Sequence, residues 1–261
     1  MNVKESELLF AQEGPLAVVT LNRPQAHNAL TWAMYDGLVE ACEKTDSSDD
    51  IRVMLIRGAG GKAFAAGTDI SQFQDFHTED DALNYERRLD QVVGRLEAVT
   101  KPTIAVIEGV AAGAGAVIAL ACDLRYCTPE SQIGVPIART LGNCLSTANY
   151  ARLMDLIGPA RTKELIFRAR LVPAETARQL GLMNDVVSAG QLHEQVKAVA
   201  LEIAAHAPIT LRATKEAIRR LQMYRREVNS DDLTVQAYMS ADFREGVAAF
   251  LEKRKPVFRG C

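Results

Sequence analysis

A run of apolar and mostly small residues, from Ala114 to Cys122, constrains the fold of this chain more than any other feature. The run is too long for a typical strand, and its composition predicts a helix that is buried on every side. The glycine-rich segment Gly109–Gly115 leads into it, and the apolar segment Thr103–Ile107, which predicts a strand, comes just before. A fold for this chain therefore has to enclose a helix that closely follows a buried strand.

Further strands are predicted along the first half of the chain. Leu16–Leu21 is apolar and rich in β-branched residues, and Asn22-Arg23-Pro24 closes it with a turn signal. Val53–Ile56 predicts a second buried strand, which a group of glycines ends. Leu124–Tyr126 and the stretch around Ile133 predict short strands.

Helices are predicted between these strands and through the second half. Thr31–Lys44 has apolar residues at helical spacing, with Thr31 as the N-cap. The polar stretch 75–81 predicts a mobile loop before a long helix over 82–99. Further helices are predicted over 147–156, 160–167, 174–179, 188–206, 209–224 and 230–253. This order predicts an α/β core over residues 1–200 and a helical C-terminal region over 201–261.

Composition excludes several classes of protein. The 261 residues are 48% hydrophobic and 24% charged with a net charge of −3, which favours a globular protein without a general nucleic-acid or anionic-membrane partner. No apolar stretch is long enough to span a membrane, and the start has no secretory signal. Five scattered cysteines without a Cys-x-x-Cys pair, and only 4 histidines, argue against disulfides and a metal site and favour the cytoplasm.

Two segments of small residues predict a binding site for developing negative charge. Lys62–Ile70 and Gly109–Gly115 each follow an apolar strand, and small residues let the backbone approach a ligand closely. The second segment also opens a helix, where free N–H groups and the helix dipole favour an anion. Either segment alone is equally compatible with a tight turn, and neither matches a Walker A loop or a dinucleotide fingerprint.

The order of motifs resembles one known family. FAAGTDI at 64–70 is similar to the first oxyanion segment of the enoyl-CoA hydratase/isomerase (crotonase) family, and 101–123 is similar to its second. Leu21–Pro24 with Asn28–Leu30 resembles the N-terminal turn that contacts CoA, and 245–255 resembles the C-terminal signature. The match runs from about Leu16 to Phe258, and several motifs in the right order are more specific than any one of them.

The resemblance implies a fold, an assembly and a site. The fold would be an α/β spiral of ββα units with a helical C-terminal trimerisation region that helps to close the CoA pocket, in a homotrimer or a hexamer of two trimers. The backbone N–H groups of Thr68 and Ala114 would hold the thioester oxygen, and CoA would enter as part of the substrate without another cofactor or a metal. The residues expected around the substrate are Ala26, His27, Ala66, Asp69, Ile70, Gly113, Arg139 and Lys253.

The sequence departs from the family where the reaction needs proton transfer. Typical hydratases of the family use two glutamates, and the corresponding positions here are Val117 and Ile137. Neither side chain can accept or donate a proton, so general acid–base help of about 10²- to 10⁴-fold per group is absent from these positions. The function expected is an enoyl-CoA hydratase/isomerase-like enzyme that stabilises an enolate. The alternatives are an acyl-CoA hydrolase, a C–C bond-cleaving relative, a non-catalytic acyl-CoA-binding protein and, more remotely, a nucleotide-binding α/β protein.

Several polar residues have two interpretations each. Arg139 either holds a carboxylate of the substrate or forms a surface ion pair. His77 and Glu79 either transfer protons or lie in a solvated loop. Cys144 has no histidine near it in sequence, which favours a structural thiol over a nucleophile. The basic group Lys253–Lys255 either approaches the CoA phosphates or ends a solvated helix, where cations suit the dipole.

Overall fold

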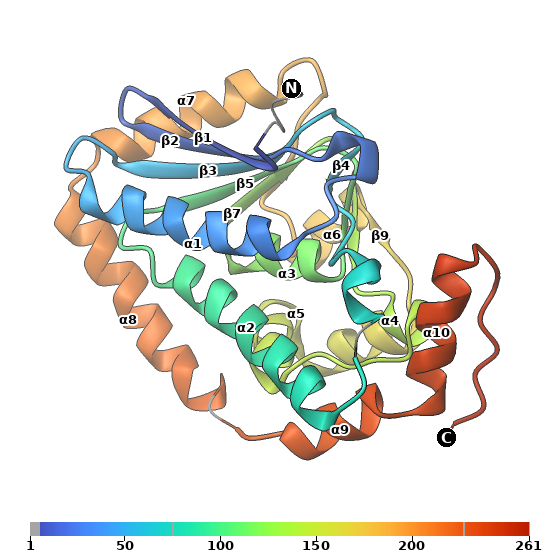
Figure 1. Ribbon diagram of the computed structural model, residues 1–261. Coiled ribbons are helices and arrows are strands. Elements are labelled where there is room, and N and C mark those ends of the chain that lie inside the picture. The colour runs from blue at the N-terminus through green and yellow to red at the C-terminus, as the bar shows by residue number, and fades with distance from the viewer. Residues whose placement is uncertain (1–5, 75, 227, 261) are drawn as a thin grey trace, which may run out of the picture.

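The computed structural model describes residues 6–74, 76–226 and 228–260, so that Asp75 and Cys261 lie outside it. Within this part of the chain, two sheets are formed (Figure 1). The first sheet has the order β1 (Leu8–Glu13), β2 (Leu16–Leu21), β3 (Val53–Gly58), β5 (Thr103–Ile107), β7 (Leu124–Cys127) and β10 (Asp185–Val186). The second has the order β4 (Ala63–Ala65), β6 (Val110–Ala112), β8 (Gln132–Gly134) and β9 (Val172–Pro173).

The helices of the first half alternate with these strands, and those of the second half follow one another. The helices are α1 (Trp32–Ser47), α2 (Glu79–Glu97), α3 (Ala114–Ala121), α4 (Ile137–Thr140), α5 (Thr147–Arg168), α6 (Ala174–Leu180), α7 (Leu192–Ala205), α8 (Pro208–Arg226), α9 (Asp231–Tyr238) and α10 (Ala241–Leu251). Short 3-10 turns occupy Pro24–Ala26 and Ile70–Phe73.

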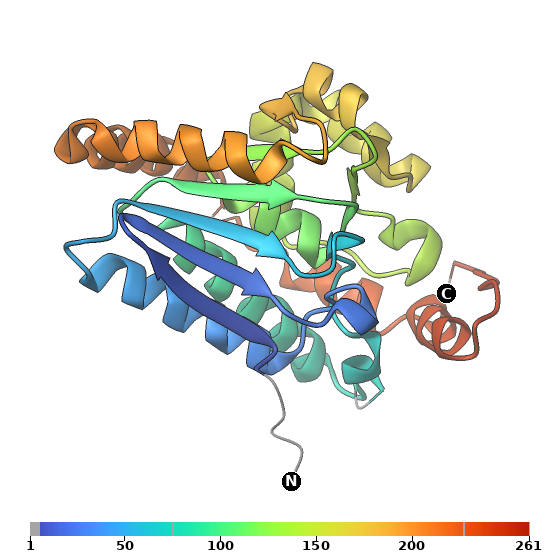
Figure 2. The same ribbon diagram turned by 90° about the horizontal axis from the view of Figure 1, so that it is seen from above.

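Strand alternation places α7 on one face of the first sheet and the main core on the other. Side chains of a strand point to opposite faces in turn. Val18, Leu55 and Val106 therefore pack in a small cluster with α7, which contacts β2, β3, β5 and β7. Their neighbours Val19 and Ile56 face the main core with α1, α2 and α3. Figures 1 and 2 show α7 along one side of the sheet and α1 along the other.

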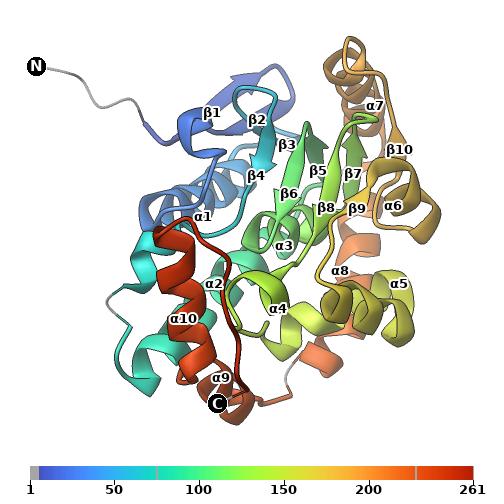
Figure 3. The ribbon, with the colours of Figure 1, turned by 90° about the vertical axis from the view of Figure 1, so that its right-hand side faces the viewer.

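The chain winds as a spiral. A strand of the first sheet leads to a strand of the second sheet and then to a helix, as in β3–β4–α2 and again in β5–β6–α3. Because β3, β5 and β7 are parallel neighbours in one sheet, and β4, β6 and β8 in the other, each turn of the chain stacks on the turn before it. Figure 3 looks onto the strands of the second sheet. The expected spiral of ββα units is confirmed.

Most elements predicted from the sequence are present. All residues of α3 are buried, which confirms the enclosed helix. Thr31 caps α1, since its side chain accepts a hydrogen bond from the Met34 amide. The helices predicted over 147–156 and 160–167 are confirmed as the two parts of α5, which kinks at Gly158, where the backbone is not helical.

Three predictions were wrong in detail. The stretch 230–253 is two helices rather than one, because the Ser240 side chain caps a new helix by accepting from the Phe243 amide. The residues 79–81, expected in a loop, form the first turn of α2, since Thr78 and Asp81 make a capping box. The second half also contains the short strands β9 and β10, which are too short for a periodic signal.

The C-terminal helices lie against the core. Helix α8 packs along α5, and α9 packs on α2. The boundary predicted at residue 200 falls within α7, and the division into a core and an oligomerisation region stays a prediction. Among the described helices, none has the length and apolar character needed to cross a membrane.

Gly94 offers a test of the local forces in α2. It lies inside the helix, its φ is not positive, and a Cβ atom added there would meet no atom within 4 Å. Replacing a helix-interior glycine with alanine removes unfolded-state freedom without a clash. We therefore expect Gly94→Ala to raise the free energy of unfolding by about 0.5–1 kcal/mol, measured by urea unfolding. A decrease in the free energy of unfolding would show that the added methyl group clashes with a neighbour, contrary to the structure.

Candidate active site

The two segments of small residues leave the second sheet side by side. Strand β4 pairs with β6 in parallel, with Ala63 opposite Val110 and Ala65 opposite Ala111. Parallel neighbours end at the same edge of a sheet, and ligands of α/β proteins bind at the carboxyl ends of such strands. The residues that follow β4 and β6 therefore come together at one edge, although they lie far apart in the sequence.

Two glycines bring these segments into close contact. Gly67 and Gly113 both have positive φ values, of 111° and 52°, which other residues rarely adopt. A Cβ atom placed on Gly113 would lie 3.7 Å from Gly67 Cα, and one placed on Gly67 would lie 4.0 Å from the Ala114 nitrogen. The backbone of the first segment thus lies directly against the start of α3.

Both N–H groups predicted for an oxyanion site lack an acceptor among the described residues. The amides of Ala66, Asp69 and Gly113 donate to backbone carbonyls. Within the part of the chain that the structure describes, the amides of Thr68 and Ala114 donate to none. Ala114 is the first residue of α3, where an unpaired N–H is expected and the helix dipole favours a negative charge.

A cavity of about 360 Å³ lies beside these two amides. The predicted residues Thr68, Ala114, Ala66, Asp69, Ile70, Gly113, Ala26 and His27 all line it. Ile137, at one of the two missing carboxylate positions, lines it as well. Much of the remaining wall is apolar and is formed by Phe73, Leu89, Leu141, Leu145 and Phe250. The cavity thus combines backbone donors with a mostly apolar wall, as sites for small molecules commonly do.

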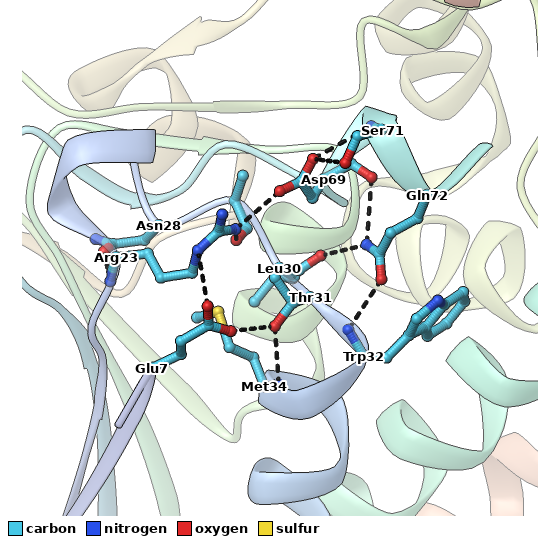
Figure 4. A network of polar contacts seen from close by, with 11 residues as sticks. Glu7, Arg23, Asn28, Leu30, Thr31, Trp32, Met34, Asp69, Ser71 and Gln72 are labelled. Atoms are coloured by element: carbon cyan, nitrogen blue, oxygen red, sulfur yellow. Dashed lines mark hydrogen bonds and ion pairs between the residues drawn. The ribbon is translucent and has the colours of Figure 1, made fainter. Parts of the chain in front are cut away.

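A polar network holds the first segment in place (Figure 4). Arg23, in the turn after β2, donates to Asp69 at 3.0 Å and to the carbonyl of Ala29 at 2.6 Å, and its Nε lies 3.5 Å from Glu7. Gln72 donates to the carbonyl of Leu30 at 3.0 Å. The predicted N-terminal turn is therefore tied to the residues that follow β4.

Asp69 has a structural role in this network. Partial burial raises its pKa, but hydrogen bonds from Ser71 and Arg23 outweigh that effect, so the pKa lies below its ordinary value. Its side chain also caps the turn that begins at Ile70 by accepting from the Ser71 amide. Asp69 is thus an ionised anchor beside the Thr68 amide.

The side chain of Thr68 is engaged inside the protein. Its Oγ1 lies 2.7 Å from the hydroxyl of Tyr35 in α1 and 2.7 Å from that of Tyr85 in α2. Burial raises the pKa of both tyrosines, so their hydroxyls are neutral. These three hydroxyls connect α1 and α2 to the first segment. Because the Thr68 hydroxyl is occupied by the two tyrosines, Thr68 contributes its backbone to the cavity.

The two positions at which the resemblance predicts the loss of a glutamate are apolar and buried. Val117 lies in α3, is 2% exposed and does not line the cavity. Ile137 begins α4, is 6% exposed and contributes to the cavity wall. Proton transfer at these two positions is therefore excluded.

Other residues predicted near the substrate lie elsewhere. Arg139 is exposed and its Nε donates to the carbonyl of Ala169, so the expected contact with a substrate carboxylate is absent from this cavity. His77 and Glu79 are exposed and do not line it. Lys253 is exposed beyond the end of α10, also outside the cavity lining.

Cys144 has the character of a structural thiol. Its Sγ lies 3.7 Å from the carbonyl of Leu233, and burial raises the pKa of the thiol to about 12. A thiol with such a pKa is almost entirely protonated at neutral pH, and only the thiolate is a nucleophile. The structural interpretation of Cys144 therefore fits its surroundings.

The cavity also contains a buried carboxyl group that sequence reasoning missed. Glu86 in α2 is 5% exposed and lines the cavity. Its Oε1 accepts a hydrogen bond of 2.5 Å from the hydroxyl of Tyr238 in α9, and Asn143 donates to that hydroxyl at 2.9 Å. Burial raises the pKa of Glu86, with a smaller upward contribution from Asp90, and the Tyr238 hydroxyl and the Ser146 amide oppose this in part, so that the pKa is about 8. Near neutral pH this carboxyl is therefore largely protonated.

Comparison with known proteins identifies the family. A family model described as enoyl-CoA hydratase/isomerase matches residues 11–261. The chain belongs to the enoyl-CoA hydratase/isomerase family. A short-chain-enoyl-CoA hydratase of Clostridium acetobutylicum is 31% identical over 96% of this chain and 96% of that protein. The 2,3-dehydroadipyl-CoA hydratase of Escherichia coli is 32% identical over 98% of this chain and 99% of that protein.

A solved structure has nearly the same fold as this chain. The structure of methylmalonyl-CoA decarboxylase complexed with 2S-carboxypropyl-CoA aligns with a TM-score of 0.89 and 29% identity, over 99% of this chain and 100% of that one. The enoyl-CoA hydratase/isomerase family therefore accounts for residues 11–261 and for the crotonase-like fold. Proteins that carry the names of different reactions share this architecture.

Proposed function

We propose that this member of the family is an acyl-CoA enzyme that stabilises the enolate of a thioester with the backbone N–H groups of Thr68 and Ala114. The observation that carries the proposal is that these two amides have no acceptor within the described part of the chain and that both residues line the same largely apolar cavity. An enolate concentrates negative charge on one oxygen, and fixed donors stabilise that charge most in the transition state. CoA enters as part of the substrate, without a further cofactor.

Simple hydration of an enoyl-CoA is disfavoured in this proposal. The water that adds to the double bond has to be deprotonated while the neighbouring carbon is protonated, and Val117 and Ile137 supply neither function. The enolate oxygen is held independently of these positions, because the donors belong to the backbone. The proposed enzyme therefore keeps the enolate chemistry of the family with a different source of protons.

Cleavage of a carbon–carbon bond next to the thioester is the second candidate reaction. Such cleavage forms the enolate without removing a proton from carbon, so it does not need the missing carboxylates. The resemblance to the methylmalonyl-CoA decarboxylase structure supports this candidate. The exposed position of Arg139 removes one expected contact for a substrate carboxylate, so recognition of such a group would rest on other atoms.

A panel of thioesters tests the proposed function. Crotonyl-CoA, 3-butenoyl-CoA, methylmalonyl-CoA and butyryl-CoA report on hydration, isomerisation, decarboxylation and hydrolysis, and calorimetry measures the binding of each. We expect saturable binding, slow hydration of crotonyl-CoA, and faster turnover of a substrate whose enolate forms without the addition of water. Rapid hydration of crotonyl-CoA would contradict the proposal that the absence of glutamates at positions 117 and 137 slows hydration. Binding without any turnover would favour an acyl-CoA-holding protein, and no binding would overturn the proposal.

We also propose that the C-terminal helices mediate a homotrimer or a hexamer. Large apolar side chains are exposed there, namely Ile209, Ile218, Leu221, Tyr224, Leu233 and Phe250. Four of them, Ile209, Ile218, Leu221 and Tyr224, lie on α8, and exposed apolar side chains gathered on one element are typical of protein–protein interfaces.

A further inference from the structure

Two buried polar atoms without a partner belong to the wall of the same cavity. Glu86 Oε2 and Asn143 Oδ1 are both covered from solvent, and neither has a hydrogen bond of normal geometry among the described residues, although the Ser146 amide lies close enough to the Glu86 carboxyl to lower its pKa. Such atoms are rare in folded proteins because each costs about 1–3 kcal/mol. Both atoms belong to residues that line the cavity, which makes a molecule bound there their available partner.

The hydrogen bonds around Glu86 have a defined direction. The Asn143 amide donates to the Tyr238 hydroxyl, and that hydroxyl donates to Glu86 Oε1. Because Oε1 is already an acceptor, the proton of the neutral carboxyl group resides on Oε2. The same Tyr238 hydroxyl stabilises the carboxylate after the proton has left.

Other polar side chains of the cavity are less suited to proton transfer. The hydroxyls of Thr68 and Tyr85 bond to each other, and Asp69 is held by Arg23 and Ser71. His27 is exposed at the rim. No cation among the described residues forms an ion pair with Glu86, so no fixed charge holds it in the ionised form.

We propose that Glu86 is the catalytic group that carries a proton to and from the carbon next to the thioester in this cavity. The proposal rests on the proposed function, since the enolate has to be held by Thr68 and Ala114. It places the source of protons on α2, away from the two positions at which the family's hydratases carry glutamates.

The proposed step balances without another reactant. The electron pair of the enolate forms a C–H bond with the proton of Oε2, the O–H bond breaks, and the enolate oxygen becomes the thioester carbonyl again. Glu86 is left as a carboxylate that regains a proton from solvent. In reverse, the carboxylate removes a proton from the α-carbon of a bound thioester. The substrate class is an acyl thioester whose reaction passes through an enolate.

Exchange of the α-protons of butyryl-CoA in deuterium oxide tests this role. We expect the full-length protein to exchange these protons, and Glu86→Gln to slow the exchange by about 10²-fold or more, the usual size of general base catalysis. Glutamine keeps the acceptor for Tyr238 and the volume of the side chain, so the dissociation constant of butyryl-CoA should change less than about threefold. Glu79→Gln, the same change on the exposed first turn of α2, is the matched control and should leave the exchange rate unchanged.

The pH dependence separates catalysis from a structural effect. Exchange needs the carboxylate, so its rate should rise with pH to a plateau with an inflection near 8, the pKa of Glu86. Tyr238→Phe removes a hydrogen bond that lowers this pKa, so its inflection should move to higher pH. The titratable groups that face Glu86 are Tyr35 from α1, Tyr85 and Asp90 from α2, Cys144 after α4, Tyr150 from α5 and Tyr238 from α9.

Slower exchange by Glu86→Gln can be distinguished from unfolding of that variant. The pKa of Glu86 is raised by folding, so its favourable contribution to stability is complete below the ordinary value of 4.5 and is lost as the pH rises through about 8. Glutamine does not ionise, and Glu86→Gln should therefore be at least as stable as the parent protein at pH 8, as thermal unfolding would show.

The outcomes distinguish the two proposals. If the parent protein binds butyryl-CoA but exchanges its α-protons no faster than Glu86→Gln does, the role of Glu86 is refuted while the proposed function stands. If Glu79→Gln slows exchange as much as Glu86→Gln does, the role of Glu86 is refuted as well. Absence of butyryl-CoA binding would overturn both proposals together.

Discussion

Ala114→Pro is expected to lower kcat/KM on the thioester that the enzyme turns over fastest by about 10²- to 10³-fold, the usual effect of losing one oxyanion donor. The substitution removes a backbone N–H beside the cavity that has no acceptor in residues 6–74, 76–226 and 228–260. Proline is well tolerated at the first position of a helix, because that N–H has no partner within the helix. The fold should therefore survive, and circular dichroism with thermal unfolding would show whether it does.

A matched control is available at the start of α10. Ala241 is also the first residue of a helix, it is exposed, and its preceding residue Ser240 has a φ of −65° and a ψ of 154°, which suit a following proline. It does not line the cavity. Ala241→Pro should keep kcat/KM within about twofold of the parent value, in line with the small effects of most distant surface substitutions. If the Ala114→Pro protein folds and keeps full activity, the Ala114 amide does not stabilise the oxyanion.

Gly115→Ala is expected to lower the free energy of unfolding by about 3 kcal/mol or more, the upper part of the range for overpacked cores. A Cβ atom at Gly115 would lie 2.2 Å from the Ala65 carbonyl oxygen and 2.7 Å from Ala65 Cβ. Since the closest atom belongs to the backbone of β4, the helix α3 and the strand have to separate. The gain in helix propensity of about 1 kcal/mol is too small to offset this.

This result contrasts with the one expected for Gly94→Ala. Both glycines lie in helices and receive the same methyl group, but the added atom at Gly94 meets open space. Urea unfolding of the two variants should therefore give changes of opposite sign. Equal changes would show that packing of α3 against β4 does not decide the outcome. If Gly115→Ala folds, we also expect reduced kcat/KM, because the movement displaces the Ala114 amide from the Thr68 segment.

The backbone part of the site could be predicted because its signals are local. A segment of small residues after a strand, and a glycine-rich turn that opens an apolar helix, each indicate where backbone can approach a ligand. The same is true of Thr31 as an N-cap and of the buried α3. The single helix expected over 230–253 was wrong because continuous helical periodicity does not reveal where a serine starts a new helix.

Glu86 was missed although the sequence contains a signal for it. The buried face of α2 includes Ala82, Tyr85, Glu86, Leu89, Val93 and Leu96 at helical spacing. One glutamate therefore stands within an apolar face, where a charged residue is costly unless it is paired or neutral. The pattern marks Glu86 as unusual, but it names neither its partners nor the cavity that it lines.

The amino-acid sequence by itself determined the family, most of the helices, several central strands, and the two backbone segments whose residues line the cavity, because these depend on residue types at short spacing. Only the tertiary structure decided which side chains share that cavity. Glu86 and Tyr238 are 152 positions apart, and Tyr238 and Asn143 are 95 apart, yet they form one hydrogen-bonded chain. Burial and pKa depend on such distant neighbours, since removal from water comes from packing of elements that no local pattern connects.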